Sequence, residues 1–290
     1  MLLQPEYNGK NLLGIDFEDW FHPQLIKKNI EDKKYEPVVI NGLDKILDLL
    51  RQNETLATFF VVGELLEYRP EIFDKIIENG HEIGFHTMYH SRLDSEKFEE
   101  KFEDEIKKFE VLTNKKSKGF RAPTFSLNKK SSWIIDVLEA YDYTYDSSII
   151  PAKSTMYGSP NAEENPYKIT SNNIEKNNID GKIIEFPLLV TKFLGKKIPA
   201  AGGFYLRSLP TKITKKAIRN YERRGIPATF YIHSWELTPE YMPKIQLPLK
   251  DNFTTFHNID KAFNRMNEIL NEFEFTSFSN YMSKEMNLSN

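Results

Sequence analysis

Residues 12–22 have the sequence Leu-Leu-Gly-Ile-Asp-Phe-Glu-Asp-Trp-Phe-His, an apolar run that ends in carboxylates and aromatic rings. The run 12–17 has the length and composition of a buried β-strand. Asp16, Glu18 and Asp19 fall at its carboxyl end. Carboxylates packed among aromatic rings are costly unless a cation or hydrogen-bond donors compensate them. Helix N-capping by Asp16 or Asp19 would explain them, and so would a bound divalent ion.

Similar apolar runs recur along the 290 residues and alternate with longer amphipathic stretches. This α/β alternation predicts a parallel sheet with crossover helices, and about seven repeats favour a barrel over an open sheet. We expect one domain, residues 1–290, with a long loop excursion at about 151–181, where Asn, Ser, Pro and Gly are frequent. Predicted strands are 12–17, 57–62, 82–85, 118–121, 143–145, 183–186, 228–233 and 275–278, and predicted helices are 39–50, 65–78, 95–112, 129–140, 211–223 and 259–273.

Composition excludes several classes of function. The chain has no cysteine, so a metal ion would have to bind to His, Asp or Glu. A formal net charge of −3 gives no electrostatic footprint for nucleic acid. No stretch reaches the roughly 18 apolar residues that a membrane span needs, and the first residues do not have the pattern of a signal peptide. We therefore expect a cytoplasmic protein without a membrane span; the sequence does not indicate an oligomeric state.

Two histidines follow the predicted strand 82–85. His86 and His90 are four residues apart, which in a helical turn places both rings on one side, where they can share a metal ion. This spacing alone is weak evidence, because two histidines also fall four apart by chance. Their position strengthens it, because the loops at the carboxyl ends of the strands form the active site of parallel β/α folds.

Arg121 and His233 follow two further predicted strands. Arg121 stays charged and would lie near any carboxylates at the same end of a barrel, although Arg-x-Pro alone indicates a structural ion pair. His233 ends an apolar run, where a lone histidine is usually a hydrogen-bonded core residue. Beside a metal ion, carboxylates and an arginine, it becomes the natural general acid.

Seven short motifs follow one another along the chain: Asp-Phe-Glu-Asp-Trp-Phe (16–21), Thr-Phe-Phe (58–60), His-x3-His (86–90), Phe-Arg-Ala-Pro (120–123), Tyr-Asp-Ser-Ser (145–148), Gly-Gly-Phe-Tyr-Leu-Arg-Ser-Leu-Pro (202–210) and Ile-His-Ser-Trp-Glu (232–236). Taken in order, these motifs resemble those of the NodB-homology polysaccharide deacetylases, carbohydrate esterase family four. The resemblance runs from about residue 12 to residue 278, and the Asp-x-Glu-Asp first motif is similar to that of the exopolysaccharide-locus branch. The ordered set is specific, although each motif alone is not.

The resemblance implies an incomplete or distorted parallel (β/α) barrel with one divalent ion, usually zinc, held by an acidic residue and two histidines. His86 and His90 match the histidine ligands. The family's commonest pattern has two adjacent aspartates, and the departure from it leaves two alternatives. In the first, preferred because it keeps adjacent spacing, Asp19 is the ligand and Glu18 is the catalytic base. In the second, Glu18 is the ligand and Asp16 is the base.

The resemblance also implies roles for residues around this centre. Arg121 matches the arginine that steadies the base, and His233 matches the general acid. Asp146 is the loosest match, as the residue that orients His233. Three aromatic residues are expected to contact the sugar: Trp20, Phe125 and Trp235.

These assignments predict a hydrolase that removes an N-acetyl group from a sugar of a polysaccharide or a glycan precursor. A backbone N–H near Thr124 or Phe125 would help to hold the oxyanion. One alternative is hydrolysis of another non-peptide C–N bond, as in a cyclic ureide or imide, and the retained histidines argue against it. The other alternative is a non-catalytic glycan-binding protein, and the complete set of expected residues argues against that.

Overall fold

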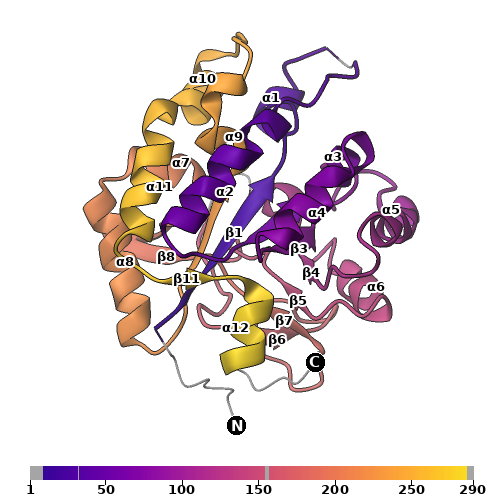
Figure 1. Ribbon diagram of the computed structural model, residues 1–290. Helices are drawn as coiled ribbons and strands as arrows, with labels where there is room; N and C mark the ends of the chain where they lie inside the picture. The colour runs from indigo at the N-terminus through magenta and orange to yellow at the C-terminus, as the bar shows by residue number, and fades with distance from the viewer. Residues whose placement is uncertain (1–8, 32, 154–156, 286–290) are drawn as a thin grey trace.

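The computed structural model of the protein describes residues 9–31, 33–153 and 157–285, and its largest feature is one curled sheet surrounded by helices (Figure 1). The first residues of the chain and part of the excursion at 151–181 lie outside the described residues. The strands are β1 (Asn11–Phe17), β2 (Thr58–Val61), β3 (Glu82–Phe85), β4 (Gly119–Phe120), β5 (Tyr145–Asp146), β6 (Tyr167–Ile169), β7 (Ile183–Glu185), β8 (Val190–Phe193), β9 (Lys196–Pro199), β10 (Thr229–His233) and β11 (Phe275–Thr276). The α-helices are α1 (Gln24–Lys27), α2 (Leu43–Gln52), α3 (Gly63–Tyr68), α4 (Glu71–Glu78), α5 (Glu99–Leu112), α6 (Ile134–Ala140), α7 (Gly203–Ser208), α8 (Thr211–Arg223), α9 (Ser234–Leu237), α10 (Leu249–Phe256), α11 (Ala262–Leu270) and α12 (Phe278–Glu285).

The large sheet has the strand order β10-β1-β2-β3-β4-β5-β7-β6, and β11 also pairs with β1. Pairing is parallel from β10 to β7, and β6 is antiparallel to β7. An isolated parallel bridge between Leu188, just beyond β7, and Thr229 of β10 brings together the two ends of the parallel part of the sheet. In the described residues, this parallel part consists of seven strands: β10, β1, β2, β3, β4, β5 and β7. The prediction of an incomplete parallel β/α barrel is confirmed.

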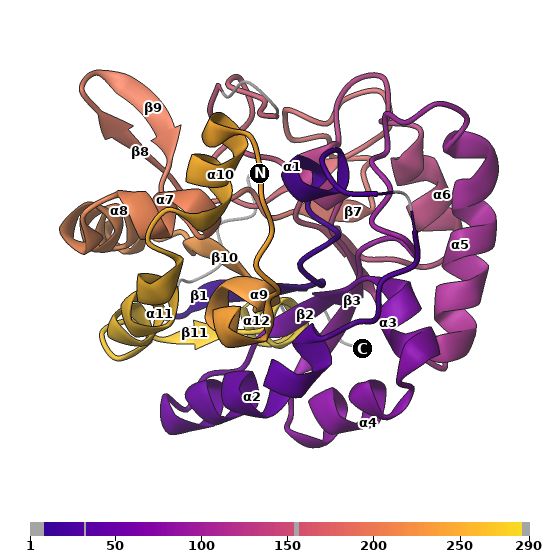
Figure 2. The same ribbon diagram turned by 90° about the horizontal axis from the view of Figure 1, so that it is seen from above.

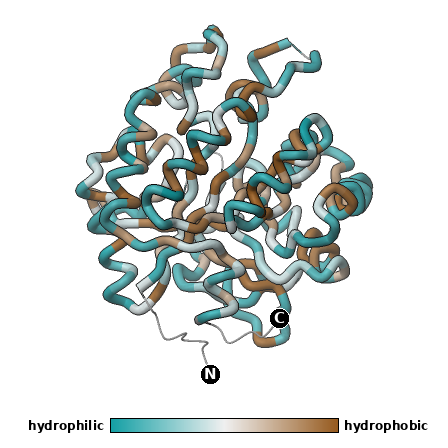
Figure 3. The backbone as a smooth tube through the Cα atoms, in the orientation of Figure 1, coloured by the Kyte–Doolittle hydropathy of each residue, from teal (hydrophilic) through white to brown (hydrophobic). Residues whose placement is uncertain are grey.

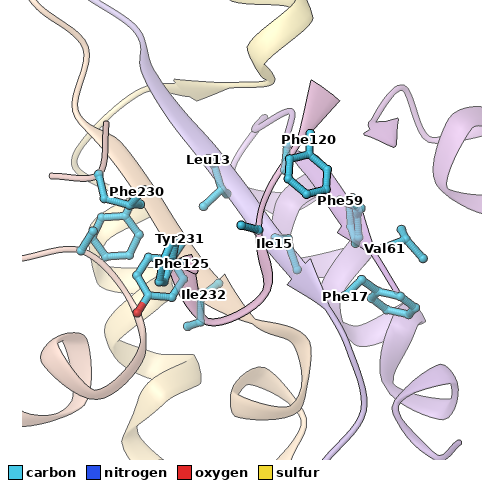
Figure 4. Packing of buried hydrophobic residues seen from close by; sticks show 14 of the residues in the cluster. Leu13, Ile15, Phe17, Phe59, Val61, Phe120, Phe125, Phe230, Tyr231 and Ile232 are labelled. Carbon is cyan, nitrogen blue, oxygen red and sulfur yellow. The ribbon is translucent and has the colours of Figure 1, made fainter. Parts of the chain in front are cut away.

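Strand β1 is buried along its whole length, because its two faces have different apolar neighbours. Leu13, Ile15 and Phe17 belong to the large core between the sheet and the surrounding helices (Figure 4). Leu12, on the other face, belongs to a second core that also includes Phe60 of β2. The alternation of side chains along a strand then places Gly14 and Asp16 on the same face as Leu12.

Helix α12 covers the amino-terminal end of the barrel. Its Phe278 belongs to the second core, and the Phe278 N–H donates to Thr58 Oγ1, at the first residue of β2. The adjacent Ser279 N–H donates to Glu82 Oε2, at the first residue of β3. The predicted last strand therefore ends at Thr276. The apolar residues Phe278, Tyr281 and Met282 have i, i+3, i+4 spacing, which is helical.

The outer helices have one apolar face and one polar face, so the brown hydrophobic residues in Figure 3 concentrate towards the sheet. Helix α2 buries Ile46, Leu47 and Leu50, and burial of each such side chain stabilises the fold by roughly 1.5–3 kcal/mol. The single helix predicted for 65–78 is instead two helices, because Pro70 separates α3 from α4.

Two features lie outside the regular alternation. Seen from above, α1 and α10 lie beside each other at the top of the barrel, and the β8–β9 hairpin extends away from the body (Figure 2). The excursion at 151–181 contributes β6 to the sheet. Among the helices of the described residues, none has the length and apolar character needed to cross a membrane.

Candidate active site

The carboxyl ends of β1 and β10 lie side by side and begin the candidate site. Asp16 is in register with His233, so the two side chains start from adjacent strands. The glycine at position 14 lets the Arg121 side chain lie directly against β1, because a Cβ atom at this position would be 2.4 Å from Arg121 Nη1. The Arg121 side chain, which is fully buried, can therefore reach across from the end of β4.

A buried cluster suited to a metal ion lies at this end of the barrel. In the described residues, the ligand atoms of Glu18, His86 and His90 lie within 4.8 Å of one another. Glu18 Oε2 is 2.6 Å from His90 Nε2. Trp235 Nε1 donates to the other carboxylate oxygen, Glu18 Oε1, at 3.0 Å. The indole thus fixes the carboxylate while its second oxygen faces the histidines.

The protonation of these groups fits a metal site. Burial acts to raise the pKa of Glu18, but the charge and hydrogen bond of His90, with smaller effects of His233 and His86, outweigh it and hold that pKa well below its usual range. Burial lowers the pKa of His86 to about 4, so its ring is neutral near pH 7. A carboxylate and a neutral imidazole are the protonation states that bind a divalent ion.

The two histidines do not lie on a helical turn, as their spacing suggested. Residues 86–90 form a loop in which Thr87 and His90 have left-handed backbone angles (φ 58° and 52°). The Met88 N–H donates to Glu105 Oε2, which ties the loop to α5. His86 Nδ1 is 2.7 Å from the Arg121 carbonyl oxygen, so an Nδ1–H donor leaves Nε2 free for a ligand.

Asp16 and Arg121 form a buried ion pair next to this cluster. Arg121 Nη1 donates to Asp16 Oδ1 at 2.7 Å. The guanidinium is held from the other side by Ser147, through the carbonyl oxygen and the hydroxyl oxygen, both at 2.8 Å. These contacts fix the Asp16 carboxylate at the wall of a cavity that Glu18 also lines.

Asp19, the preferred ligand in the sequence analysis, lies outside the cluster of ligand atoms. Its Oδ2 accepts hydrogen bonds from the Val38 and Val39 N–H groups at 2.6 and 2.8 Å, and its Oδ1 accepts one from the Trp20 N–H at 2.8 Å. Oδ2 therefore holds the backbone that leads towards α2, and Oδ1 holds the N–H group of the residue that follows Asp19. This geometry favours the second alternative, in which Glu18 is the ligand and Asp16 the base.

His233 is held by a carboxylate that the sequence analysis did not assign. His233 Nδ1 is 2.6 Å from Glu236 Oε2, and Arg207 Nε donates to Glu236 Oε1 at 2.6 Å. Burial acts to lower the pKa of His233, but the charge and hydrogen bond of Glu236, with the charges of Glu18 and Asp16, raise it to about 9. The ring is therefore protonated near pH 7. Its Nε2 lies 3.8 Å from Glu18 Oε1.

The sequence contains a local signal for the role of Glu236. A carboxylate three residues after His233, at the start of a short helix, matches a capping box, and the structure contains that box. Arg207 lies in the 202–210 motif, where Gly202 passes β10 closely: a Cβ there would lie 1.5 Å from the Tyr231 carbonyl oxygen. The glycine thus brings α7 close enough for Arg207 to reach Glu236.

Asp146 contacts other residues than His233. Its Oδ1 accepts from the Ser148 hydroxyl at 2.6 Å, and it lies against Glu185, with both carboxyl groups fully buried. Burial is the largest cause that raises the pKa of each, and the other carboxyl group raises that of Glu185 further. Ionisation of both carboxyl groups is therefore disfavoured in the folded protein.

One cavity of about 140 Å³ between α1 and α10 is lined by Asp16, Glu18, His86, His90 and His233, and also by Arg207 and Glu236. Of the three aromatic residues expected to contact sugar, Phe125 and Trp235 line it. Trp20 instead packs against Phe21 and Tyr35. Further lining residues, not expected from the sequence, are Pro23, Gln24, Leu25, Tyr157, Phe204, Tyr231, Thr254 and Thr255.

The backbone at one wall of the cavity is unusual. Thr124 and Phe125 both have left-handed angles (φ 54° and 50°), although neither is glycine. Such conformations are costly and concentrate at functional sites. The Phe125 N–H donates to the Ala122 carbonyl oxygen, so of the two N–H groups expected near the oxyanion, Thr124 is the better candidate.

Two family profiles match the chain. Residues 35–145 match the polysaccharide deacetylase family, and residues 147–283 match a domain of unknown function, DUF3473. Strands from both matched parts pair in the same sheet, because β7 of the second part lies beside β5. His86, His90 and Arg121 lie in the first part, and His233 lies in the second.

Curated relatives match over short segments. A peptidoglycan-N-acetylglucosamine deacetylase of Bacillus cereus is 33% identical over 81 residues, which are 28% of this chain and 30% of that protein. A chitooligosaccharide deacetylase of Bradyrhizobium is 42% identical over 43 residues, 15% of this chain and 20% of that protein. The matches thus span less than a third of these relatives.

Similar solved structures match over almost the whole chain. A Mycobacterium smegmatis protein described as a polysaccharide deacetylase has a TM-score of 0.57 at 17% identity, covering 97% of this chain and 92% of that one. Puue allantoinase has a TM-score of 0.55 at 13% identity, covering 97% and 94%. At such identities the likeness shows the shared fold.

Proposed function

Since the chain is a NodB-homology protein of carbohydrate esterase family four, we propose that it is a metal-dependent hydrolase that removes the acetyl group from an N-acetylated sugar of a polysaccharide or glycan precursor. One observation carries the proposal. A buried Glu-His-His cluster, an arginine-held carboxylate and a protonated histidine line the same cavity. These are the ligands, base and acid that amide hydrolysis needs.

The residues present fit a divalent ion, and we assign Glu18, His86 and His90 to hold it. In the described residues, the buried atom His90 Nδ1 has no hydrogen-bond partner, and Glu18 Oε2 faces His90 Nε2 at 2.6 Å. Two imidazoles and one carboxylate are a donor set that zinc prefers, and the chain has no cysteine to compete. Three protein ligands leave a coordination position for substrate.

The chemistry divides among the residues as follows. When bound, a zinc ion supplies Lewis-acid activation of the acetyl carbonyl and of the attacking water. Asp16, which is positioned by its ion pair with Arg121, accepts the proton of that water. The Thr124 N–H donates to the carbonyl oxygen as its negative charge develops. Protonated His233 then donates its Nε2 proton to the departing sugar nitrogen, and acetate and the amine leave.

Asp19 has a structural role in this proposal. It accepts hydrogen bonds from three backbone N–H groups, that of Trp20 and those of Val38 and Val39, so its effect on the metal ion is indirect. The Arg207–Glu236 pair replaces Asp146 as the group that orients His233. Because the carboxylate accepts from Nδ1, it directs Nε2 of the ring into the cavity.

The proposal is tested by acetate release from N-acetylated mono- and oligosaccharides with zinc-loaded protein. We expect turnover with at least one of them. The double variant His86→Ala/His90→Ala should lose it, and the control His257→Ala, at a half-buried histidine that does not line the cavity, should keep it. Turnover of a cyclic ureide without acetate release from any sugar would overturn the proposal, and so would equal activity of the double variant.

A further inference from the structure

The β8–β9 hairpin has an exposed apolar tip that the proposed function does not use. Val190 pairs with Pro199 at its base and Phe193 with Lys196 at its tip, so Leu194 and Gly195 form a two-residue turn. Its base is attached to the barrel, because the Leu189 N–H donates to the Thr229 carbonyl oxygen. The tip points away from the body (Figure 2).

The turn residue Leu194 adopts a backbone conformation that leucine disfavours. Leu194 has a φ of 48°, a left-handed conformation that a branched side chain disfavours, and Asn or Gly is the usual residue there. Its side chain is 87% exposed, so packing within the chain does not compensate the backbone cost. Phe193 beside it is also exposed. These bulky groups therefore have no role that the fold itself requires.

Positive charge surrounds this tip. Lys192 lies directly opposite Lys197, a like-charge pair that weakens a hairpin, and Lys196 follows the turn. Below the hairpin, a groove of about 480 Å³ continues the positive surface onto α8. We call it the basic groove; its charged lining residues are Lys192, Lys197, Lys216, Arg223, Arg224 and a single carboxylate, Glu164.

The charge of this face contrasts with the rest of the molecule. Glu164 pairs with Lys197 and Arg224, at 3.0 and 2.7 Å. The other cations of the groove remain in excess over this one carboxylate, although the whole chain has a formal net charge of −3. A local positive surface on an acidic protein indicates an anionic partner.

We propose that the β8–β9 hairpin and the basic groove dock the protein onto an anionic lipid surface, with Phe193 and Leu194 entering between headgroups and acyl chains. An apolar tip with lysines around it matches such a surface, because lysine stems extend along apolar groups while their charges reach lipid phosphates. A protein partner would need roughly 800 Å² of contact, far more than two side chains offer. The proposal is independent of the deacetylase assignment.

The docking hairpin is close in sequence to residues of the candidate site. β9 leads within four residues into α7, which carries Phe204 of the cavity wall and Arg207. A substrate attached to lipid would then be presented near the enzyme that modifies it.

Co-sedimentation with vesicles tests the proposal. We expect the full chain to bind vesicles of phosphatidylcholine with about a third phosphatidylglycerol, and to bind pure phosphatidylcholine much more weakly. Lys192→Gln and Lys196→Gln should each weaken binding about fivefold. Leu194→Asn should weaken it about tenfold, and it should keep or raise the melting temperature, because Asn adopts the left-handed turn readily.

A matched control and three contrary results complete the test. Ile179→Asn removes an apolar residue that is 78% exposed elsewhere, and it should bind vesicles like the wild type. Equal binding of wild type and Leu194→Asn would overturn the proposal. A large fall in melting temperature for Leu194→Asn would assign that residue to folding instead. Retention on an acidic polysaccharide but not on anionic vesicles would assign the surface to a glycan.

Discussion

Replacing Glu236 by Gln tests how the structure prepares His233 as an acid. The substitution keeps the shape of the side chain and removes the charge 2.6 Å from His233 Nδ1. The charge and hydrogen bond of Glu236 are the main causes that raise the pKa of His233 from 6.5 to about 9 against the effect of burial. Without them the pKa should fall to 6.5 or below.

The size of the effect follows from the fraction of His233 that is protonated. The donor must carry a proton, so activity falls as the pH rises through the pKa of this ring. At about pH 8, a fall of that pKa from 9 to 6.5 lowers the protonated fraction roughly thirtyfold. At about pH 6 the ring is mostly protonated in both proteins. The activity of Glu236→Gln should therefore be near that of the wild type at pH 6 and roughly thirtyfold lower at pH 8.

The assay is acetate release as a function of pH, with zinc-loaded protein and melting temperatures on the same preparations. Glu240→Gln is the control, because Glu240 is an exposed carboxylate paired with Lys45. It should leave the profile unchanged. A basic limb at the same pH in Glu236→Gln and wild type would refute the reasoning, since His233 would then not depend on this carboxylate.

Three further predictions concern buried groups around the site. Arg121→Lys keeps a charge but cannot make all three contacts to Asp16 and Ser147, so kcat should fall about tenfold or more while bound zinc is retained; steady-state rates and metal analysis check this. Asp19→Asn should lower the free energy of unfolding by roughly 1–3 kcal/mol in denaturant titrations, because an amide nitrogen cannot accept the backbone N–H bonds. Glu185 has a raised pKa, so the native state keeps a proton that the unfolded chain loses above about pH 4.5, and stability falls with rising pH; Glu185→Gln should flatten this fall, measured as unfolding free energies at pH 5 and 8.

The barrel was predictable because its strands carry a strong local signal. Up to Asp16 the run 12–17 is apolar on both faces, as a strand buried between a barrel interior and helices must be, and the structure begins β1 one residue earlier. Elements with a weak local signal were missed. The 190–199 hairpin carries lysines and a Leu-Gly turn instead of Asn-Gly, so neither alternation nor turn chemistry identifies it.

The site was predictable in position but not in detail. Strand ends meet at one end of a barrel, so His86, Arg121 and His233 could be grouped from their places after strands. The choice between Asp19 and Glu18 as ligand depends on side-chain direction beyond the strand. In the structure, the backbone N–H groups of residues 38 and 39 donate hydrogen bonds to the Asp19 carboxylate. That contact joins segments about twenty residues apart in the sequence. No local pattern specifies it.

The central claim is a zinc site on Glu18, His86 and His90, and zinc binding by single variants tests it most directly. Zinc affinity would be measured by competition with a chelator for the wild type, Glu18→Gln and Asp19→Asn. We predict one zinc ion per chain and similar affinity for the wild type and Asp19→Asn. Glu18→Gln should bind at least about tenfold more weakly, because even outer contacts to zinc ligands are worth that much. Tight binding by Glu18→Gln together with loss of zinc from Asp19→Asn would contradict the account.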